Sequence, residues 1–343
     1  MAMAPAVIDS DLPLVAAPMA GGPSSLQLAE AVGRAGGFPF LAAANADPAT
    51  MTAQIEQART WGVSFGVNLF IVGEAPNEAE PVEQYRRALA PQAAKYGMDL
   101  HIPQLDDDDQ WPQKVELLCQ NPVPVVSFTF GLPPAQQISR LRRAGSAVWA
   151  TVTTAAEAQA AQEAGVDALV VQGPAAGGHS GTWDPARVID DRPTAEVVRD
   201  VDAVTKLPLI AAGGVDGPSA VRTLLQAGAA AVQVGTLLLR TEESGASQLH
   251  KDALASEHFA ETVVTRAFTG RPARGLRNGF VDAYEPHAVT GYPAVHHMTR
   301  ELRRRAAAAG DVDGAHFWAG TGYRSAAEGP VARTIRHLAA AVR

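Results

Sequence analysis

The sequence predicts an α/β protein whose main domain is a closed barrel of eight parallel strands. Eight short apolar runs recur along the first 240 residues, and most lack the polar alternation of a half-exposed strand. Each run is followed by glycine or a polar loop and then by a helical pattern. The alternative is an open doubly wound sheet, which should carry a dinucleotide-binding glycine fingerprint after its first strand. No such fingerprint follows the first run, so the closed barrel is favoured.

The predicted strands and their helices follow one another in regular order. The strands are Leu14–Met19, Phe38–Ala43, Phe65–Phe70, Val123–Phe130, Ala147–Thr153, Ala168–Gln172, Pro208–Ala212 and Ala231–Leu238. Thr154 and Glu157 form a capping box that starts the helix after the fifth strand, and Gly165 is suited to end that helix. Pro218 and Gly228 mark the start and end of the helix after the seventh strand in the same way.

Two stretches lie outside this regular repeat. An insert at about residues 74–120 makes the third connection longer than the roughly 30 residues of one βα unit. It contains a helical pattern at Gln84–Tyr96 and the aspartate run Asp106–Asp109, which we interpret as a solvated loop rather than a metal site. We predict a barrel domain over residues 1–240 and a mostly helical part over residues 241–343. The fold class is therefore a (β/α)8 TIM barrel with a C-terminal helical extension.

Composition excludes several classes of function. The 343 residues include 28 Lys and Arg against 36 Asp and Glu, and the net charge of −8 argues against nonspecific binding to nucleic acid. The single cysteine, Cys119, excludes a disulfide scaffold, and we expect it to pack as a small apolar side chain. No apolar run approaches the roughly 18 residues of a membrane span, and no signal-peptide pattern is present. We expect a cytoplasmic protein without a membrane partner.

The loop after the sixth predicted strand carries a histidine among glycines. It reads Gln172-Gly173-Pro174-Ala175-Ala176-Gly177-Gly178-His179-Ser180-Gly181. In a barrel this loop lies at the carboxyl ends of the strands, where catalytic groups collect. Glycine lets the backbone approach a flat ligand, and histidine exchanges a proton near neutral pH. We interpret His179 as the catalytic candidate. Cofactor-binding candidates in the same loop are Gln172, Gly177 and Gly178. The alternative is a structural loop with a surface histidine.

Two further glycine motifs follow the seventh and eighth strands. Gly213 and Gly214 end the first motif, and Gln233-Val234-Gly235-Thr236 forms the second. Barrel phosphate sites typically form from these two loops, whose free backbone N–H groups face the anion. Tight strand-to-helix turns are the structural alternative. We predict a phosphate-binding site to which all six of these residues contribute.

The ends of the first and third strands complete the predicted pocket. Ala17, Pro18 and Met19 would form a wall against which a ring could lie. Asn68 places an amide at the end of an apolar strand, where it must find a polar partner in a ligand or a neighbouring loop. Together the motifs describe a pocket for a flat, phosphorylated cofactor with polar edges. FMN fits this description, and we predict no metal.

These motifs resemble those of the nitronate monooxygenase family, formerly called 2-nitropropane dioxygenases. The resemblance covers nearly the whole chain and rests on the order of residues 17–21, 66–68, 172–181, 211–214, 233–236 and 269–278, with 291–293 and 318–320 after them. It implies an FMN-containing TIM barrel with a helical second domain. By position it implies FMN contacts from Asn68, Gln172, Gly177, Gly214 and residues 233–236. His179 matches the active-site histidine of the family, and Tyr292 and residues 318–320 would lie near the substrate.

The resemblance also implies the reaction. An alkyl nitronate would be oxidised by O2 to a carbonyl compound and nitrite, with FMN carrying the electrons. His179 would hydrogen-bond the nitronate, or remove the α-proton of a neutral nitroalkane. The expected partners are thus a small-molecule substrate and O2, with no nucleic acid. The expected assembly is a monomer or a dimer.

One departure keeps other functions open. The family commonly has a glutamate where this chain has Ala175. The same glycine–histidine loop also resembles that of flavin-dependent enoyl-acyl-carrier reductases and certain quinone reductases. An NAD(P)H-dependent reductase of an enoyl thioester or quinone is therefore the second hypothesis. A flavin-binding module without turnover is the third.

Four arginines and a histidine pair remain ambiguous at this level. Arg266, Arg271, Arg274 and Arg277 either approach a phosphate or carboxylate, or form ion pairs on a solvated face. His296 and His297 are adjacent, and consecutive helical positions do not face each other, which disfavours a metal site made by the two.

Overall fold

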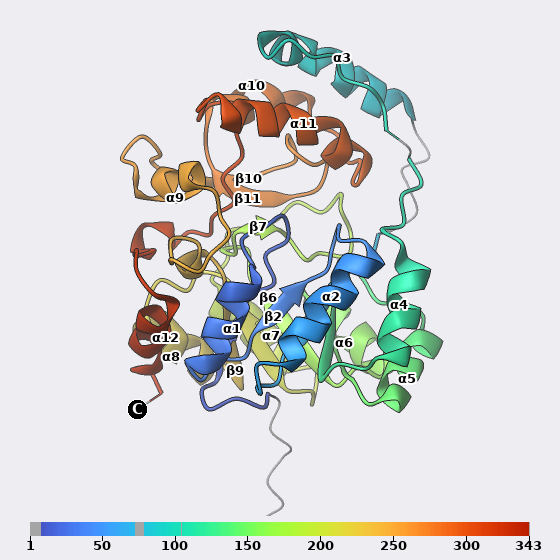
Figure 1. The fold of residues 1–343 in the computed structure, drawn as a ribbon, viewed down its shortest axis with the longest axis vertical. Helices are drawn as coiled ribbons and strands as arrows, with labels where there is room; N and C mark the ends of the chain where they lie inside the picture. The colour runs from blue at the N-terminus through green and yellow to red at the C-terminus, as the bar shows by residue number, and fades with distance from the viewer. Residues whose placement is uncertain (1–7, 73–78, 104, 343) are drawn as a thin grey trace, which may run out of the picture.

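The computed structural model describes residues 8–72, 79–103 and 105–342, and it shows a parallel barrel beneath a second, smaller layer (Figure 1). The barrel strands are β1 (Leu14–Ala16), β2 (Phe40–Ala42), β3 (Gly66–Phe70), β4 (Val125–Thr129), β5 (Ala147–Val152), β6 (Ala168–Gln172), β8 (Leu209–Ala212) and β9 (Ala231–Val234). Each lies within one of the eight predicted runs or shares most of its residues with it.

The eight strands close into a barrel. Their order is β1-β9-β8-β6-β5-β4-β3-β2, and every neighbouring pair is parallel. A parallel bridge between Val15 and Phe38 joins the two ends of this order. There the Phe38 N–H donates to the Leu14 carbonyl at 2.8 Å, and the Ala16 N–H donates to the Phe38 carbonyl at 2.9 Å. The predicted (β/α)8 barrel is confirmed.

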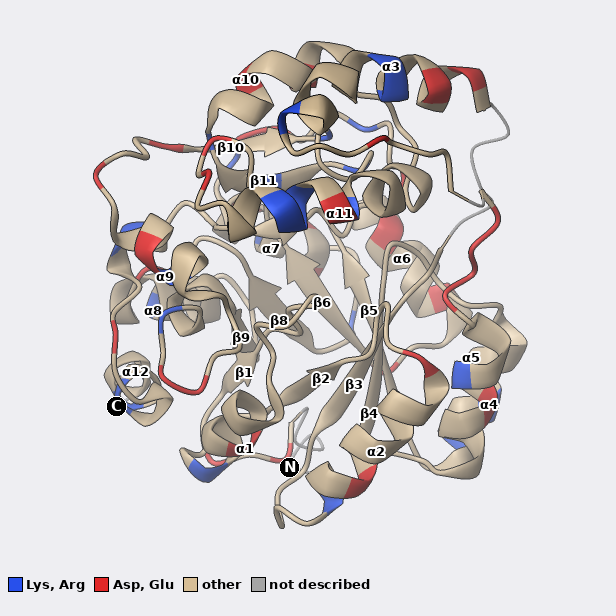
Figure 2. Ribbon diagram, turned by 45° about the horizontal axis from the view of Figure 1, so that its top comes forward, with Lys and Arg blue, Asp and Glu red and all other residues tan. Residues whose placement is uncertain are grey.

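Aromatic rings fill the amino-terminal end of the barrel interior. Phe38 and Trp149 stack with ring centroids 5.8 Å apart, and Phe40 meets Trp149 at 5.6 Å. A Cβ on Gly66 would come within 2.2 Å of the Phe40 ring, so this strand position needs glycine. The barrel strands carry no Lys, Arg, Asp or Glu, and the charged ribbon segments lie around the barrel (Figure 2). Charged side chains are thereby kept out of the barrel strands.

A ring of helices surrounds the strands. These are α1 (Leu26–Arg34), α2 (Pro48–Arg59), α4 (Trp111–Gln120), α5 (Ala135–Ala144), α6 (Ala155–Ala164), α7 (Thr194–Asp202), α8 (Pro218–Gln226) and α12 (Val331–Ala339). The predicted cap of α6 is confirmed, because the Thr154 hydroxyl accepts from the Glu157 N–H and Gly165 ends the helix in the left-handed region. The Glu157 carboxylate differs in one detail, because it accepts from the Thr153 N–H at 2.6 Å.

The second layer covers the carboxyl ends of the barrel strands, and we call it the upper layer. It comprises α3 (Ala79–Lys95), β10 (Thr262–Thr265), β11 (Ala273–Leu276), α10 (Gly279–Tyr284) and α11 (Ala294–Ala308). Its own apolar core includes the stacked rings of Phe268 and Phe280, whose centroids are 4.5 Å apart. The strand β7 (Gly178–His179) pairs with β11 and so ties the histidine loop to this layer.

The chain passes between the two layers more than once. The helix α3 of the predicted insert joins the upper layer, whereas α4 packs between α2 and α5 in the barrel ring. Near the other end of the chain, α12 packs on α1 and α8 and completes that ring. The remaining elements are α9 (Gln248–Ala255) and the 3-10 turns η1 (Thr236–Leu238), η2 (Glu285–His287) and η3 (Tyr323–Ser325). The predicted division of the chain at residue 240 stays a prediction.

The aspartate run lies in a surface loop, and two of its carboxylates also contact side chains elsewhere in the fold. Asp109 forms an ion pair of 2.7 Å with Lys114, a side chain that is only 1% exposed. Asp107 contacts His297 of α11 at 2.7 Å and thereby links the loop to the upper layer. Among the described helices, none is long and apolar enough to span a bilayer. Cys119 is half-buried against the barrel core, and burial raises the pKa of its thiol.

Candidate active site

A cavity of about 440 Å³ lies between the carboxyl ends of the barrel strands and the upper layer. This volume is in the range of pockets that hold small molecules and cofactors. The predicted site residues that line it are Ala17, Pro18, Met19, Asn68, Gln172, Gly177, Gly178, His179, Gly213, Gly214, Gln233, Gly235, Thr236 and Tyr292. Val234 is the exception, because its side chain is buried in the barrel core.

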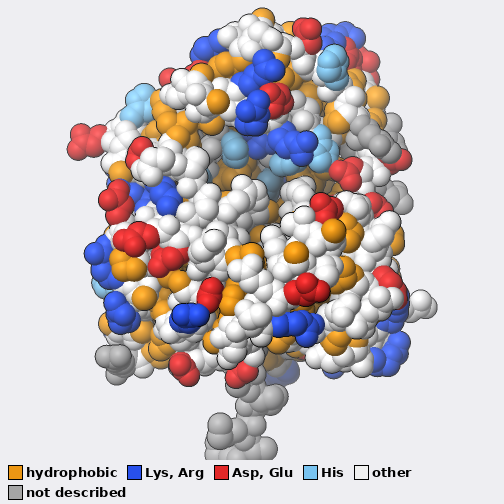
Figure 3. All heavy atoms as spheres, viewed as in Figure 1, with side chains coloured by type: hydrophobic (Ala, Val, Ile, Leu, Met, Phe, Trp, Pro, Cys, Tyr) orange, Lys and Arg blue, Asp and Glu red, His pale blue; other side chains and the backbone are white. Residues whose placement is uncertain are grey.

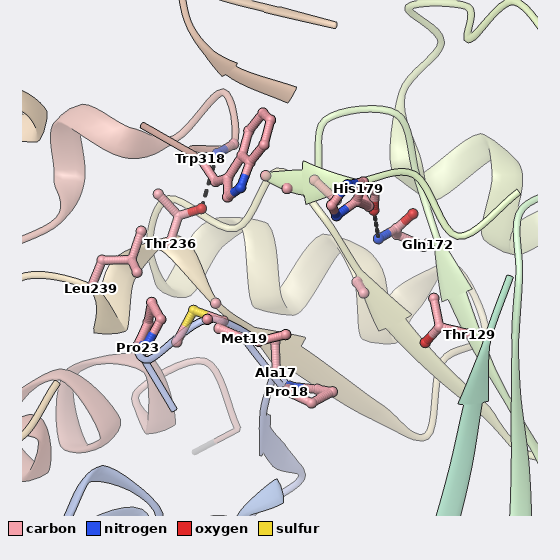
Figure 4. Close-up of a pocket in the computed structure, with 18 of the residues that line it drawn as sticks. Ala17, Pro18, Met19, Pro23, Thr129, Gln172, His179, Thr236, Leu239 and Trp318 are labelled. Carbon is pink, nitrogen blue, oxygen red and sulfur yellow. Dashed lines mark hydrogen bonds between the residues drawn. The ribbon is translucent and has the colours of Figure 1, made fainter. Parts of the chain in front are cut away.

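One corner of the cavity presents backbone N–H groups and one hydroxyl. Gly213 and Gly214 follow β8, and Gly235 and Thr236 follow β9. Their backbone N–H groups donate to no acceptor among the described residues. The Thr236 hydroxyl accepts from the Gly320 N–H at 3.0 Å, which leaves its own proton free to donate (Figure 4). Several convergent donors without acceptors are what a phosphate group requires.

Glycine is required at this corner by the close approach of two chain segments. A Cβ on Gly177 would lie 2.4 Å from the backbone nitrogen of Gly320 and 2.6 Å from the carbonyl carbon of Ala319. Gly214 has a φ of +75°, a conformation that residues with a Cβ rarely adopt. The histidine loop and the segment at 318–320 therefore meet through backbone alone at the edge of the cavity.

Polar side chains of β3, β4 and β5 form a row across the barrel, and Asn68 lies at the middle of β3 rather than at the strand end that the sequence predicted. The Asn68 amide donates to the Ser127 hydroxyl at 2.9 Å and to the Thr129 hydroxyl at 3.1 Å. Thr129 in turn contacts the Thr151 hydroxyl at 3.3 Å. The side-chain oxygen Oδ1 of Asn68 receives no hydrogen bond from a described residue and remains available as an acceptor. The row therefore presents polar groups to the cavity.

Gln172 holds the histidine loop in place. Its amide nitrogen donates to the His179 carbonyl at 3.1 Å, and its amide oxygen accepts from the Gly181 N–H at 2.6 Å (Figure 4). Both polar ends of the side chain thus have partners in the loop. The structure therefore shows Gln172 positioning His179, and only one of its two N–H donors is left for a ligand.

The side chain of His179 is fixed by Thr269. The imidazole Nε2 lies 2.9 Å from the Thr269 hydroxyl, which donates in turn to the Arg271 carbonyl at 3.3 Å. Because the hydroxyl has only one proton, this arrangement assigns the imidazole proton to Nε2. The Nδ1 lone pair then has no partner among the described residues and can accept a proton or a hydrogen bond.

Burial keeps His179 neutral. It lowers the pKa of the imidazole to about 3, and the nearby charges of Arg271 and Arg303 act in the same direction. The rings of Phe130, Tyr292 and Trp318 surround it, with centroids 5.7, 5.6 and 5.6 Å away. A bound anion would raise this pKa, because it stabilises the imidazolium. On this principle, binding of an anion would be accompanied by proton uptake at His179.

Several cavity residues were not identified from the sequence. They are Ser127, Thr129, Thr151, His250, His296, Arg303, His316 and Trp318, of which only the last was placed near the pocket by resemblance. Each of the three hydroxyl residues lies near the carboxyl end of an apolar strand, so the reasoning applied to Asn68 could have found them. The others come from helices and loops far apart in the sequence, and no local pattern brings them together.

The four ambiguous arginines have different partners, and none of them is among the residues that line the cavity. Arg277 forms ion pairs with Glu261 and Asp282 at the surface. Arg266 donates to backbone carbonyls of residues 185–187, and Arg274 pairs with Asp191 at 3.0 Å. Arg271 is buried beneath the site, with its guanidinium 3.9 Å from the Phe130 ring centroid. Of the four, Arg271 is the one whose charge helps to lower the pKa of His179.

Comparison with known proteins gives consistent results. The family model described as nitronate monooxygenase matches residues 6–341. A probable nitronate monooxygenase of Staphylococcus aureus strain Newman is 32% identical over 333 residues, which cover 96% of this chain and 93% of the relative. The crystal structure of a nitroalkane oxidase from Streptomyces ansochromogenes is 44% identical, with a TM-score of 0.91, over 97% of this chain and 96% of that chain. FabK from Thermotoga maritima is 25% identical, with a TM-score of 0.73, over 96% of this chain and 92% of that chain.

Proposed function

The chain belongs to the nitronate monooxygenase family, and we propose that it is an FMN-dependent enzyme that oxidises alkyl nitronates with O2 to carbonyl compounds and nitrite. The family and the nitroalkane oxidase neighbour support a flavin oxidoreductase that acts on nitronates. The observation that carries the proposal is the position of His179, a neutral histidine inside the cavity whose Nδ1 has no partner among the described residues.

The residues present fit FMN. The N–H groups of Gly213, Gly214, Gly235 and Thr236 would hold its phosphate, since they have no acceptor within the described part of the chain. Asn68 and the wall at residues 17–19 would contact its ring. When bound, FMN supplies the electron transfer between substrate and O2 that no side chain of this site can perform.

The side chains around the ring would bind and orient the substrate. Once protonated at Nδ1, His179 would donate a hydrogen bond to a nitronate oxygen, and in its neutral form Nδ1 would take the α-proton when a neutral nitroalkane is bound. Phe130, Tyr292 and Trp318 close the cavity around this histidine and restrict water. Burial raises the pKa of Tyr292, so its hydroxyl stays protonated and can donate to a nitronate oxygen.

Oxygen uptake by the FMN-loaded protein tests the proposal. With ethyl nitronate as substrate and no nicotinamide present, we expect O2 consumption accompanied by release of nitrite. Heat-unfolded protein with the same amount of free FMN is the control. Absence of both uptake and nitrite would contradict the proposal.

The reductase hypothesis rests on the glycine–histidine loop, which resembles that of flavin-dependent enoyl-acyl-carrier reductases, and FabK is similar over 96% of the chain. On that reading, a nicotinamide would reduce the flavin and an unsaturated substrate would reoxidise it. The nitronate reading is preferred because the neighbour called a nitroalkane oxidase has a higher identity, 44% against 25%, and a higher TM-score, 0.91 against 0.73.

A further inference from the structure

His250 is a cavity residue that the proposed function does not use. It lies in the first turn of α9, where its backbone N–H donates to the Ser247 hydroxyl at 3.2 Å. Its side chain lines the cavity and is only 9% exposed. Figure 3 shows histidine side chains around the hollow between the upper layer and the barrel. A polar ring buried in such a place requires a partner for each of its two nitrogen atoms.

One nitrogen of the His250 ring has its partner within the protein. Nε2 lies 3.0 Å from the carbonyl oxygen of Trp318. A carbonyl oxygen can only accept, so Nε2 carries the proton and donates it. Burial lowers the pKa of the imidazole to about 4, and the ring is therefore neutral at neutral pH. It follows that Nδ1 holds a lone pair and no proton.

The second nitrogen lacks a partner. No described residue donates a hydrogen bond to Nδ1 of His250. This atom is also absent from the buried polar atoms that lack a partner, so part of its surface faces the cavity. Because Nδ1 only accepts, a ligand must supply a donor. A phosphate dianion cannot do so, since its oxygen atoms also only accept, whereas a hydroxyl group can.

His250 lies between the two parts of the cavity that we assign to FMN. Its Nε2 and the Thr236 hydroxyl bond to the two ends of the segment at 318–320, each at 3.0 Å. The His250 ring is also 5.6 Å from that of Phe317, which shares an apolar cluster with Met19. Thr236 belongs to the corner proposed for the phosphate, and Met19 belongs to the wall proposed for the ring. Figure 4 shows these two side chains on the same side of the cavity.

A neighbouring hydroxyl complements the acceptor on His250. Ser247 is the N-cap of α9 and also lines the cavity. Its oxygen accepts from the His250 N–H, and its own proton has no acceptor in the part of the chain that the structure describes. The first turn of α9 thus presents one acceptor and one donor to the cavity. The ribityl chain, which joins the phosphate of FMN to its ring, carries consecutive hydroxyl groups that both donate and accept.

We propose that Nδ1 of His250 accepts a hydrogen bond from a ribityl hydroxyl of FMN, beside the donor of Ser247. This inference rests on the FMN dependence in the proposed function and adds a contact to the part of the cofactor between phosphate and ring. His250 then has two partners, the ribityl chain at Nδ1 and the Trp318 carbonyl at Nε2. The ring of Trp318 is 5.6 Å from that of His179, so the same residue positions the segment that faces the reacting group.

Flavin analogues test the contact by affinity rather than by turnover. Lumiflavin has the ring without the ribityl chain, riboflavin adds that chain, and FMN adds the phosphate. The Kd of lumiflavin divided by that of riboflavin, which we call the ribityl ratio, measures the contribution of the chain. The Kd of riboflavin divided by that of FMN, the phosphate ratio, measures the contribution of the phosphate. Quenching of flavin fluorescence by the full-length protein stripped of flavin gives each Kd.

Two variants separate the two nitrogen atoms of His250. A glutamine side chain reaches the position of Nε2 and can still donate to the Trp318 carbonyl, but it leaves no acceptor at the position of Nδ1. An asparagine side chain places a polar atom near Nδ1 instead. We expect His250→Gln to lower the ribityl ratio about fivefold, the effect of one neutral hydrogen bond, and His250→Asn to keep most of it. His297→Gln is the control and should change neither ratio, because His297 contacts Asp107 and does not line the cavity.

An unchanged ribityl ratio in His250→Gln would overturn the proposal. A loss confined to the phosphate ratio would also overturn it, because His250 would then serve the phosphate. Nitrogen NMR of the unaltered protein with labelled histidine needs no variant to fold. The signal of the unprotonated Nδ1 should shift more with riboflavin than with lumiflavin, and equal shifts would contradict the contact.

Failure of the proposed function has a different signature. If the protein does not oxidise nitronates, no O2 is consumed with them, while the flavins still bind with the expected ratios and the contact of His250 stands. If none of the three flavins binds to the unaltered protein, the FMN dependence and the contact are both overturned.

Discussion

The two walls of the cavity are built by different means. The lower wall, formed by residues 17–19, 213–214 and 235–236, presents backbone N–H groups and small side chains and carries no charge. The upper wall, formed by residues 292–318, presents aromatic rings, two neutral histidines and the buried charge of Arg303. Most substitutions leave backbone N–H donors unchanged, which suits the binding of an invariant cofactor. Side chains can be substituted to suit different substrates. His179 lies where the two walls meet.

Substitution of His179 is expected to have the largest effect on turnover. His179→Asn keeps a polar side chain of smaller size but removes the proton acceptor. We expect turnover with a neutral nitroalkane to fall by about 10²–10⁴, the usual value of a general base, while FMN stays bound. Steady-state rates and the flavin content of the purified variant measure both. His297→Asn is the control, because His297 contacts Asp107 and does not line the cavity. Unchanged turnover would remove His179 from the mechanism.

The next largest effect is expected at the edge of the cavity, where Gly177 meets the segment at 318–320. Gly177→Ala places a Cβ within 2.4 Å of the Gly320 nitrogen, and backbone cannot yield as a flexible side chain does. We expect a loss of about 1–3 kcal/mol in the free energy of unfolding, together with weaker FMN binding. Urea unfolding and flavin titration provide the measurements. Gly217→Ala is the matched control, because its Cβ would meet no atom within 4 Å. Equal free energies of unfolding and equal FMN affinities of the two variants would show that the close approach at Gly177 affects neither.

The pH dependence of the free energy of unfolding tests the burial of the histidines in the upper part of the cavity. Burial lowers the pKa of His250 from 6.5 to about 4 and that of His296 to about 2. The unfolded chain therefore binds more protons below about pH 6.5, so stability is full above that pH and falls as the pH decreases. Each such histidine contributes up to about 1.4 kcal/mol per pH unit. Urea unfolding at about pH 7 and about pH 5 measures the difference.

Variants assign this pH dependence. His250→Gln should make stability less dependent on pH, and His101→Gln, at an exposed position, should leave the dependence unchanged. The same pH dependence in both variants would mean that the buried histidines are not its source.

Substitution of Thr269, the hydrogen-bond partner of His179, is expected to have the smallest effect on turnover. Thr269→Val removes the hydroxyl that contacts Nε2 at 2.9 Å. One neutral hydrogen bond contributes about 1 kcal/mol, so we expect roughly a fivefold loss of kcat with nitroalkane. Thr269→Ser should restore most of the rate because it restores the hydroxyl. A loss that serine does not recover would indicate that the threonine acts through packing alone.

The lower wall could be predicted from sequence because its signals are local. Glycines and small residues directly after apolar strands specify both the barrel and the backbone donors at its mouth. Gly213, Gly214, Gly235 and Thr236 lie together for that reason. Gln172 shows the limit of this reasoning. Its place at a strand end was evident, but its amide turned out to hold the histidine loop.

The upper wall could not be predicted because its geometry depends on packing between distant segments. His296 and Arg303 lie on α11 and His316 lies in the segment after it, and only the folded upper layer places all three around one cavity. The closing helix α12 presents the same difficulty, since nothing local indicates that residues 331–339 pack between α1 and α8. Hydrophobic pattern predicts that such helices exist but not which surface they cover.

Anaerobic mixing of the FMN-loaded protein with a nitronate or with NADPH tests the central claim most directly. The visible absorbance of the flavin reports its reduction in both cases. We predict rapid bleaching by propionate 3-nitronate and no bleaching by NADPH on the same timescale. Rapid bleaching by NADPH with no response to the nitronate would contradict the account and establish the reductase chemistry instead.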